Sequence, residues 1–304
     1  MGYKIILFNC FFFIAIFMAL YNSTSFAKYK TGTFTIDYNL DESTLEPSGI
    51  TIFQNKILII SDNKQNSAIY ELIKNFDIYN IKLFLNFNTK DLDSIDMKFN
   101  LDIEGIVTIR NNFFLVDEKN RHIYRVTGEG RIKHIEDDIS QYNRIHKIEF
   151  SWKKNCGFEG IAFDPFNKYL FVANEREDPI IYKLKFVRNK LVTVDHIFMS
   201  KILNNKNVDI SDLCFDRGHL YITHRRGFNL IKIDPYQKTI KDKFNYSSIT
   251  RGIYKSYNDF GFTEGTYLTK DRILLVLDSG GKKMIDSNSG QNGMLIILKR
   301  PAGF

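Results

Sequence analysis

The sequence predicts an all-β protein, a five-bladed β-propeller in which each blade contains four antiparallel strands. One unit recurs five times along the chain, with 52 to 56 residues between equivalent positions. Each unit contains short runs of alternating apolar residues separated by turns, which is the pattern of strands. The repeats show no sustained apolar spacing of helical period, which argues against a helical solenoid and against a two-domain α/β protein.

Each unit opens with a small or acidic residue, which Gly follows in four units and Asp212 in the fourth. In the third unit we expect strands at 161–163 (IAF), 169–173 (YLFVA) and 180–186 (IIYKLKF). A more variable fourth strand follows at 193–199. The opening positions of the five units are Ser48, Glu104, Glu159, Ser211 and Glu264.

A second set of polar residues stands where the second strand of each unit is expected to end. These residues are Asp62, Glu118, Glu175, His224 and Asp278. The innermost strand of each blade lines the central channel of a propeller. If the strand that opens each unit is the innermost one, its opening residues converge near the axis, and the second set lies one turn further out. Isolated carboxylates in an apolar core would be too costly, and we therefore expect them to face a shared channel mouth.

Crowded carboxylates raise one another's pKa values unless a cation compensates their charge. Oxygen ligands in a flexible ring suit Ca²⁺ better than Zn²⁺, and the pattern therefore predicts a Ca²⁺ site. The alternative is that these residues only cap turns and bond the amides of neighbouring blades. The predicted metal ligands are Glu104, Glu159, Glu175, Glu118, Asp62, Glu264 and Asp278.

The N-terminus reads as a secretory signal peptide over residues 1–27, followed by one propeller domain over 28–304. A short positive start precedes about 16 apolar residues, fewer than the roughly 20 that a membrane span needs. Ser25 and Ala27 fit a small-x-small cleavage site. We expect export to the periplasm or cell envelope, with membrane contact only if this segment stays uncleaved and acts as an anchor.

The formal charge of +7 is spread along the chain, with no block of Lys and Arg, and we expect no nucleic-acid partner. Cys156 and Cys214 remain after cleavage, and two buried thiols are favoured over a disulfide. We expect a monomer. In the fifth unit, the Gly- and Ser-rich segment 279–293 interrupts the strands and predicts a long exposed loop.

The ordered motifs of the units resemble the SdiA-regulated, YjiK-like family of exported or membrane-tethered bacterial proteins. The resemblance spans about residues 33–300, and it implies a five-bladed propeller, a calcium site and an N-terminal export or membrane segment. The chain departs from the family pattern at Asp212 and His224. The motifs that carry it are SGI at 48–50, DIEGI at 102–106, GFEGIA at 157–162, EREDPIIY at 175–182, DISDL at 209–213 and TEG at 263–265.

A second resemblance is to phytase-like propellers with esterase-like activity, which share the pattern N-x-G-F-E-G-I-A found at 155–162. It implies a calcium-dependent phosphoesterase. Binding the phosphate group of its substrate would require positively charged groups beside the carboxylates. The candidate donors, each alternatively a solvated loop charge, are Arg176, Arg225, Arg226, Lys282 and Lys283.

Three functions therefore remain open. The first is a non-catalytic, calcium-binding scaffold or sensor of the cell envelope, and the second is the phosphoesterase. The third is a propeller that binds an unidentified ligand or protein at its channel face without a metal. The chain contains no G-x-S-x-G nucleophile elbow and no H-E-x-x-H spacing, which disfavours serine hydrolase and zinc protease chemistry. Fold alone does not choose among the three.

Overall fold

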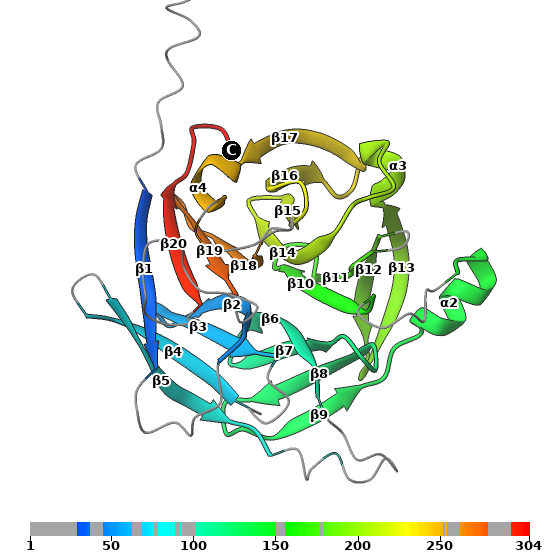
Figure 1. Cartoon of the computed structure of the whole chain (residues 1–304). Helices are drawn as coiled ribbons and strands as arrows, with labels where there is room; N and C mark the ends of the chain where they lie inside the picture. Colours follow the sequence, from blue (N-terminus) through cyan, green and yellow to red (C-terminus); the bar gives the residue numbers. More distant parts are fainter. Residues whose placement is uncertain are drawn as a thin grey trace, which may run out of the picture.

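A computed structural model shows the five predicted blades arranged around a central axis (Figure 1). The structure describes residues 29–36, 45–62, 68–75, 78–88, 92, 101–149, 156–176, 179–251, 253, 262–278 and 293–304. The predicted signal segment 1–27, most of the fifth-unit loop 279–293, Lys282 and Lys283 lie outside these residues. In the described part of the chain, no helix is both long and apolar enough to cross a membrane.

The first four blades each contain four antiparallel strands, and chain order runs from the axis outwards. The first two blades contain β2 (Pro47–Phe53), β3 (Lys56–Ser61), β4 (Ala68–Asn75) and β5 (Ile78–Asn86), then β6 (Ile103–Ile109), β7 (Asn112–Asp117), β8 (His122–Thr127) and β9 (Ile132–Ile135). The next two contain β10 (Phe158–Asp164), β11 (Tyr169–Asn174), β12 (Ile180–Val187) and β13 (Lys190–Phe198), then β14 (Ile210–Asp216), β15 (His219–His224), β16 (Asn229–Asp234) and β17 (Thr239–Asn245).

The fifth blade joins the two ends of the chain. It contains β18 (Thr263–Leu268), β19 (Arg272–Leu277) and β20 (Met294–Lys299), and its outermost strand is β1 (Tyr29–Ile36). β1 pairs antiparallel with β20 and also parallel with β5 of the first blade. The N-terminal strand therefore closes the ring, a role that the repeat pattern did not reveal because β1 stands apart from the other strands of its blade in the sequence.

In the described part of the chain, three short helices follow the outer strands of the second, third and fourth blades, and the strand pattern of the sequence did not predict them. They are α2 (Ile139–His146), α3 (Met199–Leu203) and α4 (Ser247–Thr250). α2 buries Ile139 and Asn143, and the Asn143 side-chain amide donates a hydrogen bond of 3.0 Å to the Tyr182 hydroxyl of β12. α2 ends at His146, and its C-cap residue Lys147 has a φ of 53°, which lies in the left-handed region.

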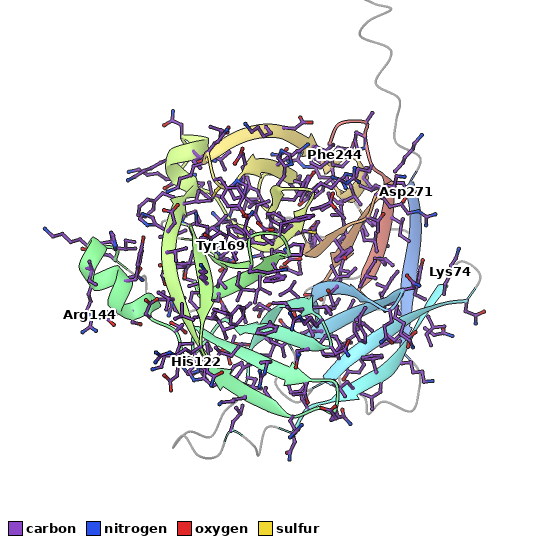
Figure 2. All side chains as sticks on the ribbon, turned by 180° about the vertical axis from the view of Figure 1, so that it is seen from behind. Lys74, His122, Arg144, Tyr169, Phe244 and Asp271 are labelled. Atoms are coloured by element: carbon purple, nitrogen blue, oxygen red, sulfur yellow. The ribbon has the colours of Figure 1, made fainter. Side chains whose placement is uncertain are left out.

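The hydrophobic core lies between the blades. Each of the five hydrophobic clusters in the described part of the chain joins two neighbouring blades. Because both faces of a blade pack against neighbours, the second strands are buried on both faces and read as continuous apolar runs, such as Leu274–Leu277. Side chains fill the space between the blades when the molecule is seen from behind (Figure 2). The two cysteines of the predicted mature chain, Cys156 and Cys214, are buried thiols.

The five innermost strands, β2, β6, β10, β14 and β18, approach one another closely around the axis, each against the next. Gly49, Gly105, Gly160 and Gly265 lie at these contacts. A Cβ atom on Gly105 would stand 2.4 Å from the carbonyl oxygen of Glu159 in the next blade. The close approach therefore requires glycine, as the sequence pattern suggested.

The fourth blade replaces this glycine with Asp212, which is buried. Its carboxylate accepts one hydrogen bond of 2.7 Å from its own strand, at the Leu213 N–H, and another of 2.7 Å from the Thr266 N–H of the fifth blade. Asp212 thus joins two innermost strands through a side chain where the other blades use direct backbone contact.

We predict that Gly105→Ala destabilises the protein by about 1–3 kcal/mol, because the new methyl group overlaps a backbone oxygen that cannot easily move. Chemical denaturation measures the loss. Gly128→Ala is the matched control, since its Cβ would meet its nearest neighbour at an ordinary 3.6 Å. Equal stability of the two variants would show that the innermost strands tolerate wider spacing.

Candidate functional site

A cavity of about 180 Å³ opens at the axis, where the innermost strands begin. It is strongly polar, and all seven carboxylates predicted to converge lie around it. The fold achieves this because equivalent positions of five blades point towards one axis. The residues that line the cavity are Pro47, Ser48, Asp62, Glu104, Glu118, Glu159, Glu175, Arg176, Arg225, Glu264 and Asp278.

The opening position of each blade has one of two roles. Glu104, Glu159 and Glu264 line the cavity from β6, β10 and β18. In the other two blades, the hydroxyls of Ser48 and Ser211 each donate a hydrogen bond of 2.7 Å to a carbonyl of the next blade, at Ile103 and Thr263. The serines hold neighbouring blades together, and among the five opening positions only the three glutamates carry negative charge.

The second position of each blade is defined by a shared backbone hydrogen bond. In every blade, one residue directly after the second strand donates its backbone N–H. The acceptor is the carbonyl of the residue two places before the opening position of the same blade. The donors and acceptors are Asp62 to Glu46, Glu118 to Asp102, Glu175 to Gly157, Arg225 to Asp209 and Asp278 to Phe262, at 2.8–3.1 Å.

The fourth member of this set is therefore Arg225, and its assignment to His224 from the sequence was wrong. His224 is the last residue of β15, buried, with Nδ1 3.3 Å from the backbone of Asp209. The spacing could have revealed the error. Asp62, Glu118 and Asp278 each stand fourteen positions after the opening residue of their blade, as Arg225 does and His224 does not.

Arg225 lies at the centre of an ion-pair network. Its side chain is only 12% exposed, so it is no solvated loop charge. Nη1 donates to both carboxylate oxygens of Glu264, at 2.6 and 2.5 Å. Nη2 donates to Glu175 Oε1 at 2.5 Å and to Asp209 Oδ1 at 3.2 Å. Arg225 thus connects carboxylates from the third, fourth and fifth blades.

Two neighbouring arginines also contact carboxylates. Arg176 pairs with the adjacent Glu175 and lies 3.7 Å from Asp209. Arg226 contacts Asp209 Oδ2 at 3.1 Å through Nε and does not line the cavity. The three arginines that the sequence offered as phosphate donors therefore all engage carboxylates of the protein.

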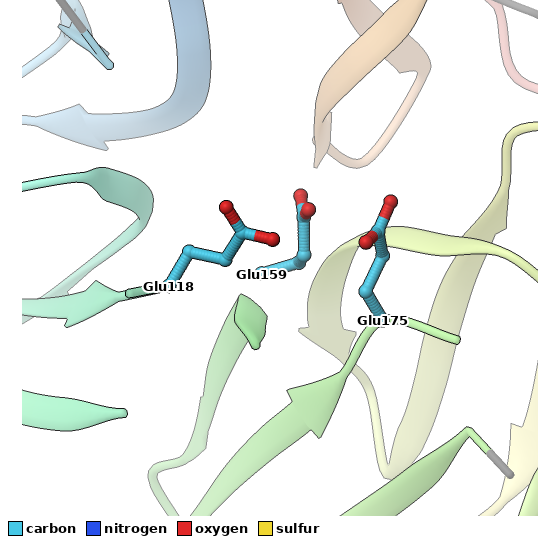
Figure 3. A group of neighbouring side chains, drawn as sticks. All are labelled: Glu118, Glu159 and Glu175. Carbon is cyan, nitrogen blue, oxygen red and sulfur yellow. The ribbon is translucent and has the colours of Figure 1, made fainter. Parts of the chain in front are cut away.

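Three of the carboxylates form a compact group. Each of Glu118, Glu159 and Glu175 offers one oxygen, and these oxygens lie within 4.8 Å of one another. Glu159 stands between the other two (Figure 3). The Glu175 side chain is fully buried, and its Oε2 atom has no hydrogen-bond partner among the described residues. An unpartnered buried carboxylate oxygen is costly unless a ligand satisfies it.

The cavity carries an excess of negative charge, because seven acidic and two basic side chains line it. Burial, followed by repulsion from Glu46, raises the pKa of Asp62 to about 8. Burial also raises the pKa of Glu104 and Glu159 well above the usual range, and neighbouring carboxylates add to the shift. Without a bound cation, the Asp62 carboxyl favours the protonated state at neutral pH, and burial shifts Glu104 and Glu159 in the same direction.

The other end of the innermost strands has a different character. A second cavity of about 200 Å³ lies two to four residues further along these strands. Apolar side chains from all five blades line it, among them Ile52, Val107, Phe163, Phe215 and Tyr267. Among the described residues, no acidic side chain lines this second cavity.

Residues 81–265, more than half of the chain, match the model of the SdiA-regulated family. This protein belongs to the SdiA-regulated family. The match covers the second, third and fourth blades completely and reaches the opening glutamate of the fifth, so it includes most of the residues around the acidic cavity. No curated protein matches the sequence of this SdiA-regulated protein.

Several solved structures are similar to this SdiA-regulated protein at low sequence identity. A glutaminyl cyclase from Myxococcus xanthus has a TM-score of 0.54 at 10% identity, with 90% of this chain and 96% of that chain covered. A PQQ-bound aldose sugar dehydrogenase from Streptomyces coelicolor has a TM-score of 0.47 at 12% identity, covering 90% and 99%. A virginiamycin B lyase from Staphylococcus aureus has a TM-score of 0.43 at 13% identity, covering 87% and 76%. The likeness to the glutaminyl cyclase shows the fold and no activity.

We predict that the cation-free protein loses stability as the pH rises from about 5 to about 8. The raised pKa of Asp62, Glu104 and Glu159 means that the folded protein binds more protons than the unfolded chain in this interval. That stability is complete below the unfolded-state pKa values and is lost as the pH rises through the folded-state values. Thermal unfolding in the presence of a chelator measures the effect.

Asp62→Asn should flatten this pH dependence, because it removes a group that titrates at about 8. A cation-free thermal midpoint that stays constant or rises between pH 5 and 8 would show that these carboxylates are ionised in the folded protein.

Proposed function

We propose that this SdiA-regulated protein binds one calcium ion in the acidic cavity and acts as a non-catalytic scaffold or sensor of the cell envelope. The observation that carries the proposal is the group formed by Glu118, Glu159 and Glu175, with the buried and unpartnered Oε2 of Glu175. Three carboxylates so close together are stable in the charged state only with a cation between them.

The chemistry of the ligands favours calcium. The group provides only carboxylate oxygens, which hard cations prefer, and no nitrogen or sulfur ligand of the kind typical of zinc. Calcium binds oxygens at about 2.3–2.6 Å, so two of its ligands stand at most about 5 Å apart. The 4.8 Å limit on the three oxygens fits this distance without rearrangement of the blades.

The charge around the cavity favours binding over phosphate ester hydrolysis. A phosphate would meet seven acidic side chains, and the two arginines that line the cavity, Arg176 and Arg225, already contact carboxylates. Phosphoryl transfer requires positive groups directed at the phosphate. The phosphoesterase is therefore the less supported alternative.

Export remains part of the proposal because of the sequence of residues 1–27. Cleavage after Ala27 would leave the whole of β1, which begins at Tyr29, on the mature protein. The strand that closes the ring would thus survive processing. The acidic cavity would then meet the calcium of the envelope, with an unidentified ligand or protein as its partner at the channel face.

Calcium should stabilise the purified protein. At a concentration about 100 times the dissociation constant, the gain is about 2.7 kcal/mol, which raises the thermal midpoint by several degrees. Glu159→Gln removes the central carboxylate of the group and should abolish the calcium effect while the protein still folds, since the neutral side chain relieves repulsion. Thermal unfolding with calcium and with chelator measures both.

Glu129→Gln is the control, because Glu129 is an exposed carboxylate on the turn between β8 and β9, with 73% of its side chain accessible. It should retain the full calcium response. A wild-type midpoint that is the same in calcium and chelator would exclude the calcium site and leave the metal-free binding propeller. Hydrolysis of a generic phosphomonoester that is lost in Glu159→Gln would favour the phosphoesterase.

N-terminal sequencing of protein recovered from the native host should give a chain that begins at Lys28. Removal of residues 1–27 follows from the cleavage site after Ala27. A recovered chain that retains Met1 and fractionates with membranes would instead support the uncleaved anchor.

A further inference from the structure

We infer that Arg225 is a built-in cation that occupies one half of the acidic cavity, so that the protein takes one divalent cation and not two. The inference rests on the proposed cation binding and adds what determines its stoichiometry. It begins from the position of Arg225, which holds the place in the fourth blade that a carboxylate holds in each of the other four.

The carboxylates around the cavity fall into two groups by blade. Glu104, Glu118, Glu159 and Glu175 come from the second and third blades, whereas Glu264, Asp278 and Asp62 come from the fifth and first. The fourth blade stands between the third and the fifth in the ring. The residue that follows the second strand of the fourth blade can therefore reach both groups of carboxylates. This residue is Arg225, and it contacts Glu175 in one group and Glu264 in the other.

The contacts of Arg225 with the fifth blade resemble those of a bound cation. Both oxygens of Glu264 accept from Nη1 at 2.6 and 2.5 Å, so the carboxylate is held on both sides by one positive group. A guanidinium stays charged at every physiological pH, so this neutralisation is permanent. A divalent cation beside Glu264 would have to displace Arg225 from it.

The contact with Glu175 instead favours cation binding by the carboxylates of the second and third blades. Arg225 and Arg176 both engage Oε1, which fixes the carboxylate and leaves Oε2 without a partner. Oriented carboxylates bind metals better than mobile ones, because the ordering cost is already met. Arg225 is thus a positioning residue for the calcium group and a competitor for a second ion.

Arg225 is itself held firmly in place. Its N–H bonds to the Asp209 carbonyl at 3.0 Å, and Nη2 bonds to the Asp209 carboxylate at 3.2 Å. Asp209 is fully buried, and Arg226 contacts its second oxygen. These contacts make displacement of the guanidinium by a metal ion costly.

The test is the number of calcium ions bound per chain, measured by isothermal titration calorimetry and by metal analysis of the dialysed protein. The wild type should bind one. Arg225→Met keeps an unbranched apolar side chain in place of the aliphatic part of arginine but removes the guanidinium and its charge, and it should bind two, with a lower thermal midpoint in chelator than the wild type. Arg225→Lys retains a positive charge at this position and should bind one.

Lys243→Met is the matched control, because it removes a positive charge from an exposed residue of β17 in the same blade, which does not line the cavity. It should bind one calcium ion. Two ions on Lys243→Met would show that overall charge, and not the position of Arg225, determines the number.

Two ions on the wild type, or one ion on both the wild type and a folded Arg225→Met, would overturn the inference. If Arg225→Met folds only in calcium and then holds two ions, the inference stands. If it does not fold in either condition, the wild type and Arg225→Lys decide, since two ions on either protein overturn the inference and one on both supports it. No ion on the wild type but one on Arg225→Met would refute the proposed function and keep the role of Arg225.

Discussion

The close approach of the five innermost strands to one axis is the constraint on which the rest of the structure depends. Glycine at four of the five contacts lets the backbones meet, and Asp212 joins the strands at the fifth. Once the strands meet, their opening residues share a cavity of about 180 Å³. The same packing that stabilises the ring therefore creates the electrostatic problem at its centre.

The blades resolve this problem in different ways. Ser48 and Ser211 carry no charge and bond the next blade instead. Arg225 supplies a permanent positive charge that reaches carboxylates of the third and fifth blades. Glu159 and its neighbours from the second and third blades keep a negative excess, and protons or a cation must balance it. The cavity is thus asymmetric although the fold is nearly five-fold symmetric.

The blades and the convergence of the acids could be predicted because both follow from a local pattern that repeats. Apolar alternation predicted the strands, and a step of 52 to 56 residues placed equivalent carboxylates in equivalent blades. β1 was missed because its partners, β20 and β5, are chosen by ring closure and not by sequence neighbours. His224 was assigned in place of Arg225 because residue type outweighed spacing in the comparison of the units.

The sequence by itself therefore determined the five units, their strand order and the residue types brought to the axis, since these depend on short-range periodicity. Only the tertiary structure decided which charges neutralise one another. Arg225 contacts residues 39 and 50 positions away in the chain, and such pairs depend on distances of a few ångströms that no local pattern records. Coulomb energies change steeply over that range, so the chemistry of the cavity follows from the packing of the blades.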